Sequence, residues 1–279
     1  TLILFIASFA VHICMAQPRK LSAANDGLAM KPIEQTIFYS LGDARIPIKI
    51  LQFGKKKDIV YINVHDSEPT SVAAAKAILA FTGGTIIKLA NKGKRNIKFH
   101  LKNKTYSFDA NRIYSREGIE QTLRASGRIS KMAIDEIEKF GKRILQLIPD
   151  STTCIVSLHN NTNGDFSIKN YLPKGDRRID AKAVYVDSLQ DFDDITLTTD
   201  SILYLKMVEN CYNSIWQDNA NARRDGSLSV YFGERNRRYM NIETENGKLL
   251  LHIEMIKKLL QILEESNLTN INYSSTNTE

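Results

Sequence analysis

Strand-like and helix-like segments alternate along most of this chain. The run SVAAAKAILAF (71–81) has the composition of a helix, and Gly83 and Gly84 separate it from the strand-like TIIKLA (85–90). Repeated alternation of this kind is typical of proteins in which helices cover both faces of a sheet. We therefore expect an α/β fold, specifically a single-domain three-layer sandwich with a mixed, largely parallel sheet flanked by helices.

Periodicity and turn residues place the expected elements. The strand at 46–53 is expected to pair with the strand at 58–65 across Gly54. One domain is expected at 30–266, preceded by a linker at 17–29 and followed by a polar tail at 267–279. The other expected strand-like segments are 97–115, 154–159, 182–189, 227–232 and 239–245. The other expected helices are 118–125, 130–148, 201–216 and 248–265.

The first sixteen residues, TLILFIASFAVHICMA, contain no charged side chain. The stretch is short for a membrane span and ends in Ala16, as expected for a signal peptide at 1–16. An uncleaved membrane anchor is the alternative. Since no other segment is long and apolar enough to cross a bilayer, we expect a secreted or periplasmic protein with no membrane span in its mature chain.

The chain is basic, with a formal net charge of +7 and a pI of about 9.2. Such a charge favours anionic partners. The basic residues are scattered in KKK (55–57), KGKR (92–95) and RNRR (235–238), without the interleaved aromatic residues of a single-strand binder. We therefore expect no nucleic-acid partner.

The spacing of the cysteines does not indicate a metal site. Beyond the expected signal peptide the chain has Cys154 and Cys211, without CxxC spacing. The two can pair in an oxidising compartment or stay as free, buried thiols, and the sequence leaves this open.

Two of the five histidines end apolar, strand-like segments: His65 closes DIVYINVH, and His159 closes CIVSLH. Strand ends in α/β sheets face a common crevice, so both histidines are expected to meet Glu68 there. Two imidazoles and one carboxylate suffice for a catalytic zinc with its fourth position open to water. The HxxE spacing alone is a weak signal, and Asp66 could replace Glu68 as a ligand or orient an imidazole.

Four motifs then follow in order: HDSE (65–68), DANR (109–112), SLHNN (157–161) and NIETENG (241–247). This order resembles the zinc carboxypeptidase superfamily, which includes metallocarboxypeptidases, stem-peptide amidases, and the succinylglutamate desuccinylase and aspartoacylase branch. The resemblance implies one Zn²⁺ per chain, and it also implies substrate and catalytic groups. The implied metal ligands are His65, Glu68 and His159. The implied substrate groups are Asn111 and Arg112, with Arg112 also catalytic and Glu243 as the general base.

The residue types suit these roles. The guanidinium of Arg112 can hold a carboxylate through two parallel bonds or steady an oxyanion, whereas an ion pair with Glu117 is the structural alternative. Asn111 could instead fix the turn. Glu243 and Glu245 share one face of a strand, and Glu243 is preferred because the more apolar run before it would raise its pKa.

Two features of the superfamily have no clear counterpart. The carboxypeptidase branch has a further arginine between its HxxE and Asn-Arg motifs, and here Arg95, in a lysine-rich loop, is the only arginine in that interval. The mobile tyrosine of the superfamily has two candidates, Tyr231 and Tyr239. The short interval from HxxE to DANR is more like the desuccinylase branch.

We therefore expect a secreted zinc-dependent hydrolase of amide bonds in peptides, including cell-wall stem peptides, that uses a metal-activated water and a glutamate base. One alternative is an N-acyl amino acid deacylase of the desuccinylase type. Another is a catalytically inactive relative that binds peptides or wall fragments. The expected partner in each reading is an anionic ligand derived from peptide or cell wall.

Overall fold

The computed structural model describes residues 28–55 and 58–266, so the expected signal peptide, most of the expected linker and the polar tail lie outside the described residues. No described helix is long and apolar enough to cross a membrane. The strands are β1 (Ile33–Leu41), β2 (Ala44–Phe53), β3 (Ile59–Asn63), β4 (Gly84–Leu89), β5 (Asn96–Leu101), β6 (Lys104–Asp109), β7 (Cys154–Asn161), β8 (Ala181–Tyr185), β9 (Ile195–Thr198), β10 (Ser214–Gln217) and β11 (Tyr239–Glu245). The helices are α1 (Pro69–Thr82), α2 (Arg116–Ala125), α3 (Lys131–Leu145), α4 (Ser201–Glu209), α5 (Leu228–Gly233) and α6 (Leu249–Glu265). Short 3-10 helices span Ala110–Arg112, Ile168–Tyr171 and Arg178–Asp180.

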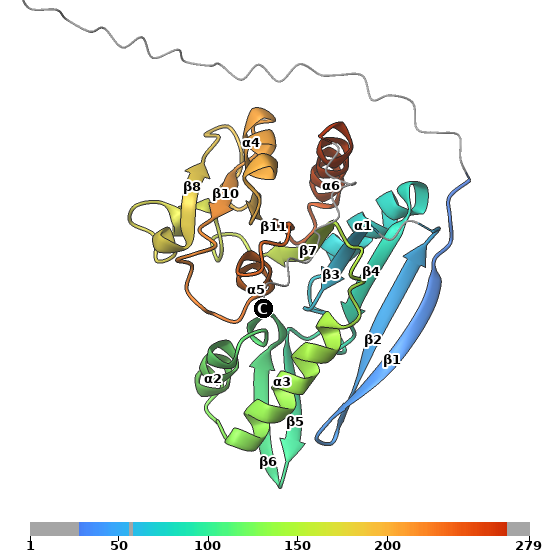
Figure 1. Cartoon of the computed structure of the whole chain (residues 1–279), viewed down its shortest axis with the longest axis vertical. Coiled ribbons are helices and arrows are strands. Elements are labelled where there is room, and N and C mark those ends of the chain that lie inside the picture. Colours follow the sequence, from blue (N-terminus) through green and yellow to red (C-terminus); the bar gives the residue numbers. More distant parts are fainter. Residues whose placement is uncertain (1–27, 56–57, 267–279) are drawn as a thin grey trace, which may run out of the picture.

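Nine strands form one mixed sheet in the order β1-β2-β4-β3-β7-β11-β9-β10-β8 (Figure 1). Its central strands β4, β3, β7 and β11 run parallel to one another. Antiparallel strands extend the sheet on both sides, where β2 joins β4 and β9 joins β11. The expected mixed α/β fold is thereby confirmed. Because β3, β7 and β11 share one direction, the residues at their carboxyl ends lie along one edge of the sheet.

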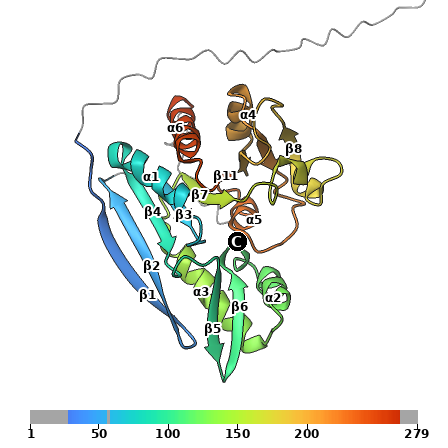
Figure 2. The same ribbon diagram turned by 180° about the vertical axis from the view of Figure 1, so that it is seen from behind.

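Helices cover both faces of this sheet, as a three-layer sandwich requires (Figures 1 and 2). One face is covered by α1, α4 and α6, whose buried side chains include Leu79, Met207 and Leu259. The other face is covered by α2, α3 and α5, together with the hairpin of β5 and β6, through residues such as Ile119 and Phe140. The parallel strands are consequently buried on both faces, which explains their continuous apolar sequences.

Two strand expectations are wrong. The segment SLSVYF (227–232) forms α5, because the Ser227 side chain accepts a hydrogen bond from Val230 N and so caps a helical turn. Strand β2 pairs with β1 and β4, whereas β3 lies between β4 and β7, so 46–53 and 58–65 are not neighbours. The intervening helix α1 lets β3 and β4 pair in parallel instead.

One helix is also shorter than expected. The segment 201–216 ends as a helix at Glu209, and Cys211 adopts a positive φ of 63° before β10 begins. A left-handed residue at this point ends the helix and turns the chain. Strands β1 and β9 were not expected, because β1 is a largely exposed edge strand and β9 has only 4 residues.

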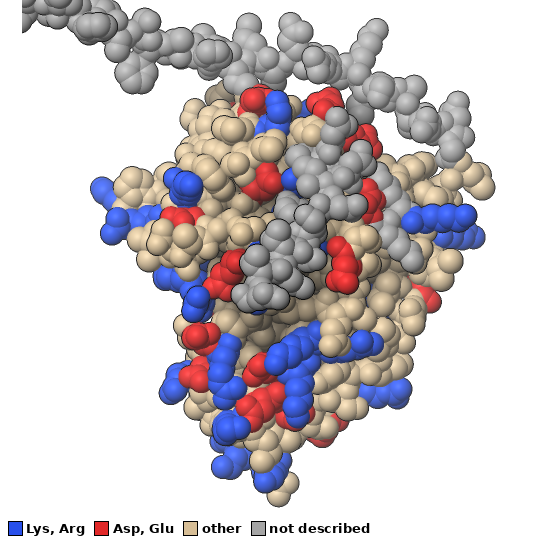
Figure 3. Space-filling model, viewed as in Figure 1, with Lys and Arg blue, Asp and Glu red and all other residues tan. Residues whose placement is uncertain are grey.

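The hairpin of β5 and β6 stands apart from the main sheet (Figure 2). A two-residue turn joins its strands, and Lys102 and Asn103 both have positive φ there, at 48° and 59°. The inner side of the hairpin buries Phe99 and Phe108, and Phe108 packs edge-on against Phe140 of α3. The α3 side of the molecule carries interleaved basic and acidic side chains (Figure 3).

Candidate metal centre

Two central strands and one helix bring His65, Glu68 and His159 together. His65 follows β3, and Glu68 is the residue immediately before α1, with its backbone N–H donating to His65 O at 3.1 Å. His159 lies in the neighbouring β7. The Glu68 side chain makes no capping bond to its own helix and is therefore available to both imidazoles.

The ligand atoms of the three residues converge on one point. Nδ1 of His65 lies 2.8 Å from Glu68 Oε1, and Nδ1 of His159 lies 2.8 Å from Glu68 Oε2. The two Nδ1 atoms are 3.2 Å apart. All three residues are buried. This set of nitrogen and oxygen donors is the kind that zinc selects in catalytic sites.

Asp109 fixes the orientation of one imidazole. Its Oδ1 lies 2.7 Å from His65 Nε2, so a neutral His65 that donates Nε2–H to this carboxylate points the electron pair of Nδ1 at Glu68. Electron pairs from an imidazole and a carboxylate then face each other at 2.8 Å, away from water. A cation bound between these two groups would accept both electron pairs and remove their repulsion. The residues present therefore fit a zinc ion.

The electrostatics keep both carboxylates ionised. When no cation is bound and the imidazoles carry the proton instead, burial raises the pKa of Glu68, but the charges and hydrogen bonds of His159 and His65 outweigh burial and leave the pKa lowered. The pKa of Asp109 is likewise lowered, because His65 and Arg95 outweigh the effect of burial. Ionised carboxylates are the form that binds a metal or orients a ligand imidazole.

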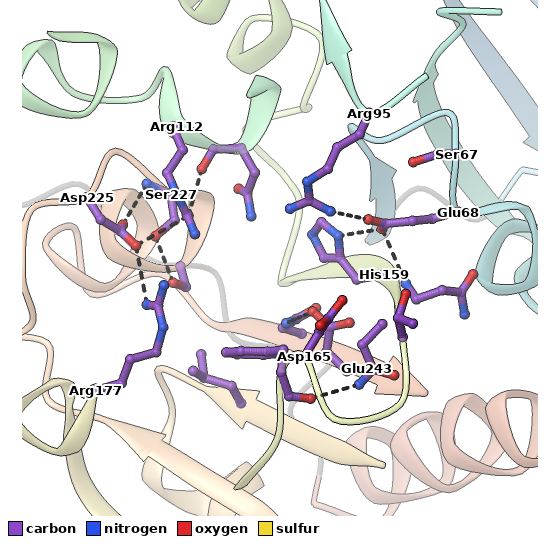
Figure 4. Close-up of a pocket in the computed structure, with 18 of the residues that line it drawn as sticks. Ser67, Glu68, Arg95, Arg112, His159, Asp165, Arg177, Asp225, Ser227 and Glu243 are labelled. Carbon is purple, nitrogen blue, oxygen red and sulfur yellow. Dashed lines mark hydrogen bonds and ion pairs between the residues drawn. The ribbon is translucent and has the colours of Figure 1, made fainter. Parts of the chain in front are cut away.

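Glu243 lines, together with Glu68 and His159, a cavity with a volume of about 500 Å³ (Figure 4). In the parallel pairing of β11 with β7, Glu243 lies opposite His159. Burial raises the pKa of Glu243, the charge of His159 lowers it, and the balance is a raised pKa. Asn241 Nδ2 donates to Glu243 Oε1 at 3.1 Å and so orients the carboxylate.

Glu245 is placed differently. It lies opposite Asn161 at the end of the strand, and its Oε1 lies 3.5 Å from Lys248 Nζ. It is not among the residues that line the cavity. Sequence spacing left the two glutamates equivalent, whereas the structure puts Glu243 alone beside the histidines.

Arg112 lies across the cavity from His159 (Figure 4), and the preceding residue, Asn111, also lines the cavity. Arg112 Nη1 lies 3.3 Å from Asp225 Oδ2, which also lies 3.6 Å from Arg177 Nη1. Asn111 Oδ1 accepts a hydrogen bond from Leu228 N, so this side chain also fixes the start of α5. The alternative ion pair of Arg112 with Glu117 does not occur.

Arg95, in the lysine-rich loop, lines the cavity beside Glu68. Its Nη1 lies 2.6 Å from Glu68 Oε1, and its Nη2 lies 3.1 Å from Asp109 Oδ2. The signal that could have revealed it is its place as the only arginine between HDSE and DANR.

Asp66 is neither a metal ligand nor a partner of an imidazole. Its Oδ2 accepts from the backbone N–H groups of Asn91 and Gly93, both at 2.8 Å, and its Oδ1 binds Lys88 Nζ at 3.1 Å. It therefore fastens the loop that carries Arg95.

No sequence motif signalled Arg177 or Asp225, which reach the cavity from irregular segments.

The two cysteines do not bond to each other. Cys154, at the start of β7, is a free and fully buried thiol. Burial raises its pKa to about 12.

No known protein-family model matches the sequence, and no curated protein matches it. Solved structures with a similar chain course include an aspartoacylase family protein from Mesorhizobium loti, with 12% identity and a TM-score of 0.45 over 84% of this chain and 68% of that one. A metallo-carboxypeptidase from Burkholderia cenocepacia has 10% identity and a TM-score of 0.45 over 83% of this chain and 65% of that one. A succinylglutamate desuccinylase from Silicibacter has 12% identity and a TM-score of 0.41 over 86% of this chain and 69% of that one.

Proposed function

We propose that this protein is a secreted zinc-dependent hydrolase of amide bonds in peptides. The observation that carries the proposal is the convergence of buried ligand atoms from His65, Glu68 and His159 at the wall of a cavity that Glu68, His159 and Glu243 line. The direct test incubates the full chain, loaded with zinc, with short peptides and with acylated amino acids, and measures the free amines released. Amine release that a chelator abolishes and added zinc restores supports the proposal.

The metal ligands, Glu243 and Arg95 each have a chemical task in the proposed reaction. Zinc held by the three ligands would supply a Lewis acid that polarises the substrate carbonyl and makes water a stronger nucleophile. Glu243 accepts a proton from the attacking water and delivers it to the departing nitrogen. Arg95, next to Glu68, donates hydrogen bonds to the carbonyl oxygen as negative charge develops there.

The far end of the cavity suits a carboxylate on the substrate. Arg112 and Arg177 carry two positive charges, and Asp225 between them carries one negative charge, so the group keeps one net positive charge. The planar guanidinium of Arg112 can bind a carboxylate through two parallel hydrogen bonds. We therefore propose peptides with a free carboxylate near the scissile bond, such as bacterial cell-wall stem peptides.

A deacylase that releases an amino acid from a small acyl group is the second candidate. The same carboxylate site and a cavity of about 500 Å³ would also hold an acylated amino acid. Analysis of the products formed from peptides and from acylated amino acids separates the two activities. An inactive, ligand-binding relative would bind peptide without releasing amine.

A peptide with a free terminal carboxylate should be cleaved faster than the same peptide amidated at that position. Hydrogen bonds to a charged group contribute about 1.5 to 3 kcal/mol, so we expect kcat/KM to differ by roughly 10- to 150-fold. Arg112→Gln should remove this preference. The measurement is kcat/KM for both peptides with both proteins.

Arg124 provides the control for Arg112. It is an exposed arginine on α2, and Arg124→Gln should leave the preference unchanged. Equal rates on the two peptides with the wild-type protein would rule out carboxylate recognition by Arg112. That result would instead favour an oxyanion-stabilising role and an internal amidase.

A further inference from the structure

One segment beside the cavity is strongly basic. From Lys92 to Phe108 the chain contains no acidic residue. The loop before β5 and the hairpin of β5 and β6 expose five lysines in this segment, which we call the basic hairpin. These lysines are Lys92, Lys94, Lys98, Lys102 and Lys104.

The charges of the basic hairpin are not neutralised within the part of the chain that the structure describes. None of its five lysines forms an ion pair there, whereas Arg95 in the same segment is paired with Glu68 and Asp109. The α3 side differs, since basic and acidic groups such as Lys142 and Glu138 neutralise each other on it (Figure 3). Unpaired lysines concentrated on one projection attract an anionic partner.

The basic hairpin is continuous with the cavity. Lys92 and Lys94 lie in the loop that Asp66 fastens, and Arg95 of that loop lines the cavity. Strand β6 ends at Asp109, which contacts Arg95, and the next turn carries Arg112, which lines the cavity. The lysines therefore extend outward from the rim of the cavity along a hairpin about 20 Å long, at 3.4 Å per residue.

The side chains that the hairpin exposes indicate which class of anionic partner it suits. Phe99, Tyr106 and Phe108 are buried, so the ring that the hairpin exposes is the imidazole of His100, which is paired with Asp43. It also exposes no large hydrophobic side chain that would insert into a membrane. A chain of carboxylates needs neither feature and requires only spaced positive charges.

We propose that the basic hairpin binds an acidic peptide segment that extends from the substrate held in the cavity. This inference rests on the proposed function for what occupies the cavity, and it adds the chemistry of the substrate beyond the cleaved bond. Lys98, Lys102 and Lys104 are exposed along the hairpin and so offer several positive charges to the carboxylates of an extended acidic peptide.

The test uses a fluorescein-labelled peptide of about ten glutamates and the full chain, with binding followed by anisotropy at low and raised salt. The triple variant Lys98→Gln, Lys102→Gln, Lys104→Gln should weaken binding by about tenfold or more at low salt. The matched control replaces Lys31, Lys76 and Lys257, three exposed lysines outside the basic hairpin, by glutamine. It makes the same change in net charge and should alter binding by less than about twofold.

Equal weakening in both triple variants would overturn the proposal, because attraction would then follow net charge alone. Tighter binding of a single-stranded oligonucleotide or of phosphatidylglycerol vesicles than of the acidic peptide would also overturn it. The binding measurement requires no turnover, so it is independent of the hydrolase proposal. Chelator-sensitive hydrolysis without acidic-peptide binding would remove only this inference.

Discussion

His159→Ala is expected to remove bound zinc and hydrolysis together. The variant leaves one histidine and Glu68, and two ligands rarely retain zinc. It also removes the partner that lies 2.8 Å from Glu68 Oε2 and so leaves a buried carboxylate less compensated. Metal content per chain and the rate of amine release are measured on the same preparation, and both should fall to background.

His100→Ala is the matched control for this variant. His100 is exposed and pairs with Asp43 on the surface, away from the cavity. It should keep both the metal and the activity. Since His159 is buried, circular dichroism and a more conservative His159→Asn variant establish that the fold persists. Full metal stoichiometry in a folded His159→Ala protein would disprove the ligand assignment.

Glu243→Gln should retain zinc and lose turnover. Loss of a general base typically costs about 10²- to 10⁴-fold in rate, and glutamine keeps the size of the side chain without its basicity. Glu245→Gln is the control, because Glu245 contacts Lys248 at the strand end and does not line the cavity. Its effect should be small. A larger loss from Glu245→Gln would transfer the role of base to that residue.

The pH dependence gives a second measurement of the same residue. Burial raises the pKa of Glu243, so the carboxylate becomes protonated at a higher pH than an ordinary glutamate. Activity should therefore be full above this raised pKa and fall as the pH drops through it. Asn241→Leu removes the hydrogen bond that favours the ionised form, so the acid limb of kcat/KM should move to still higher pH. An unchanged acid limb in Asn241→Leu would show that the hydrogen bond from Asn241 does not affect the pKa of Glu243.

The central part of the sheet was predictable because its signals are local. Continuous apolar runs mark β3 and β7, and a histidine at the end of each run marks the edge where the strands open toward the cavity. The closing helix was equally clear from its stripe of apolar residues. By contrast, the serines of 227–232 alternate with apolar residues as in a strand, although Ser227 is in fact a helix cap.

The site was partly predictable for the same reason. His65 and Glu68 are separated by one turn, so their proximity is a local property of the chain. Arg177 and Asp225 reach Arg112 only after distant loops have folded against each other, and no local pattern encodes that approach. The position of Arg95 is also not encoded locally, because it depends on how Asp66 fastens the loop that carries Arg95.

The rate at which a reagent in solution alkylates the buried thiol of Cys154 can report on β7, the strand that carries His159. With its pKa raised to about 12 and its side chain fully buried, the thiol has almost no reactive thiolate in the folded protein at neutral pH. An alkylating reagent can modify it only when β7 separates from its neighbours. The labelling rate of Cys154 therefore reports the opening of the centre of the sheet, and a ligand that binds the metal site at the other end of the strand should slow this labelling.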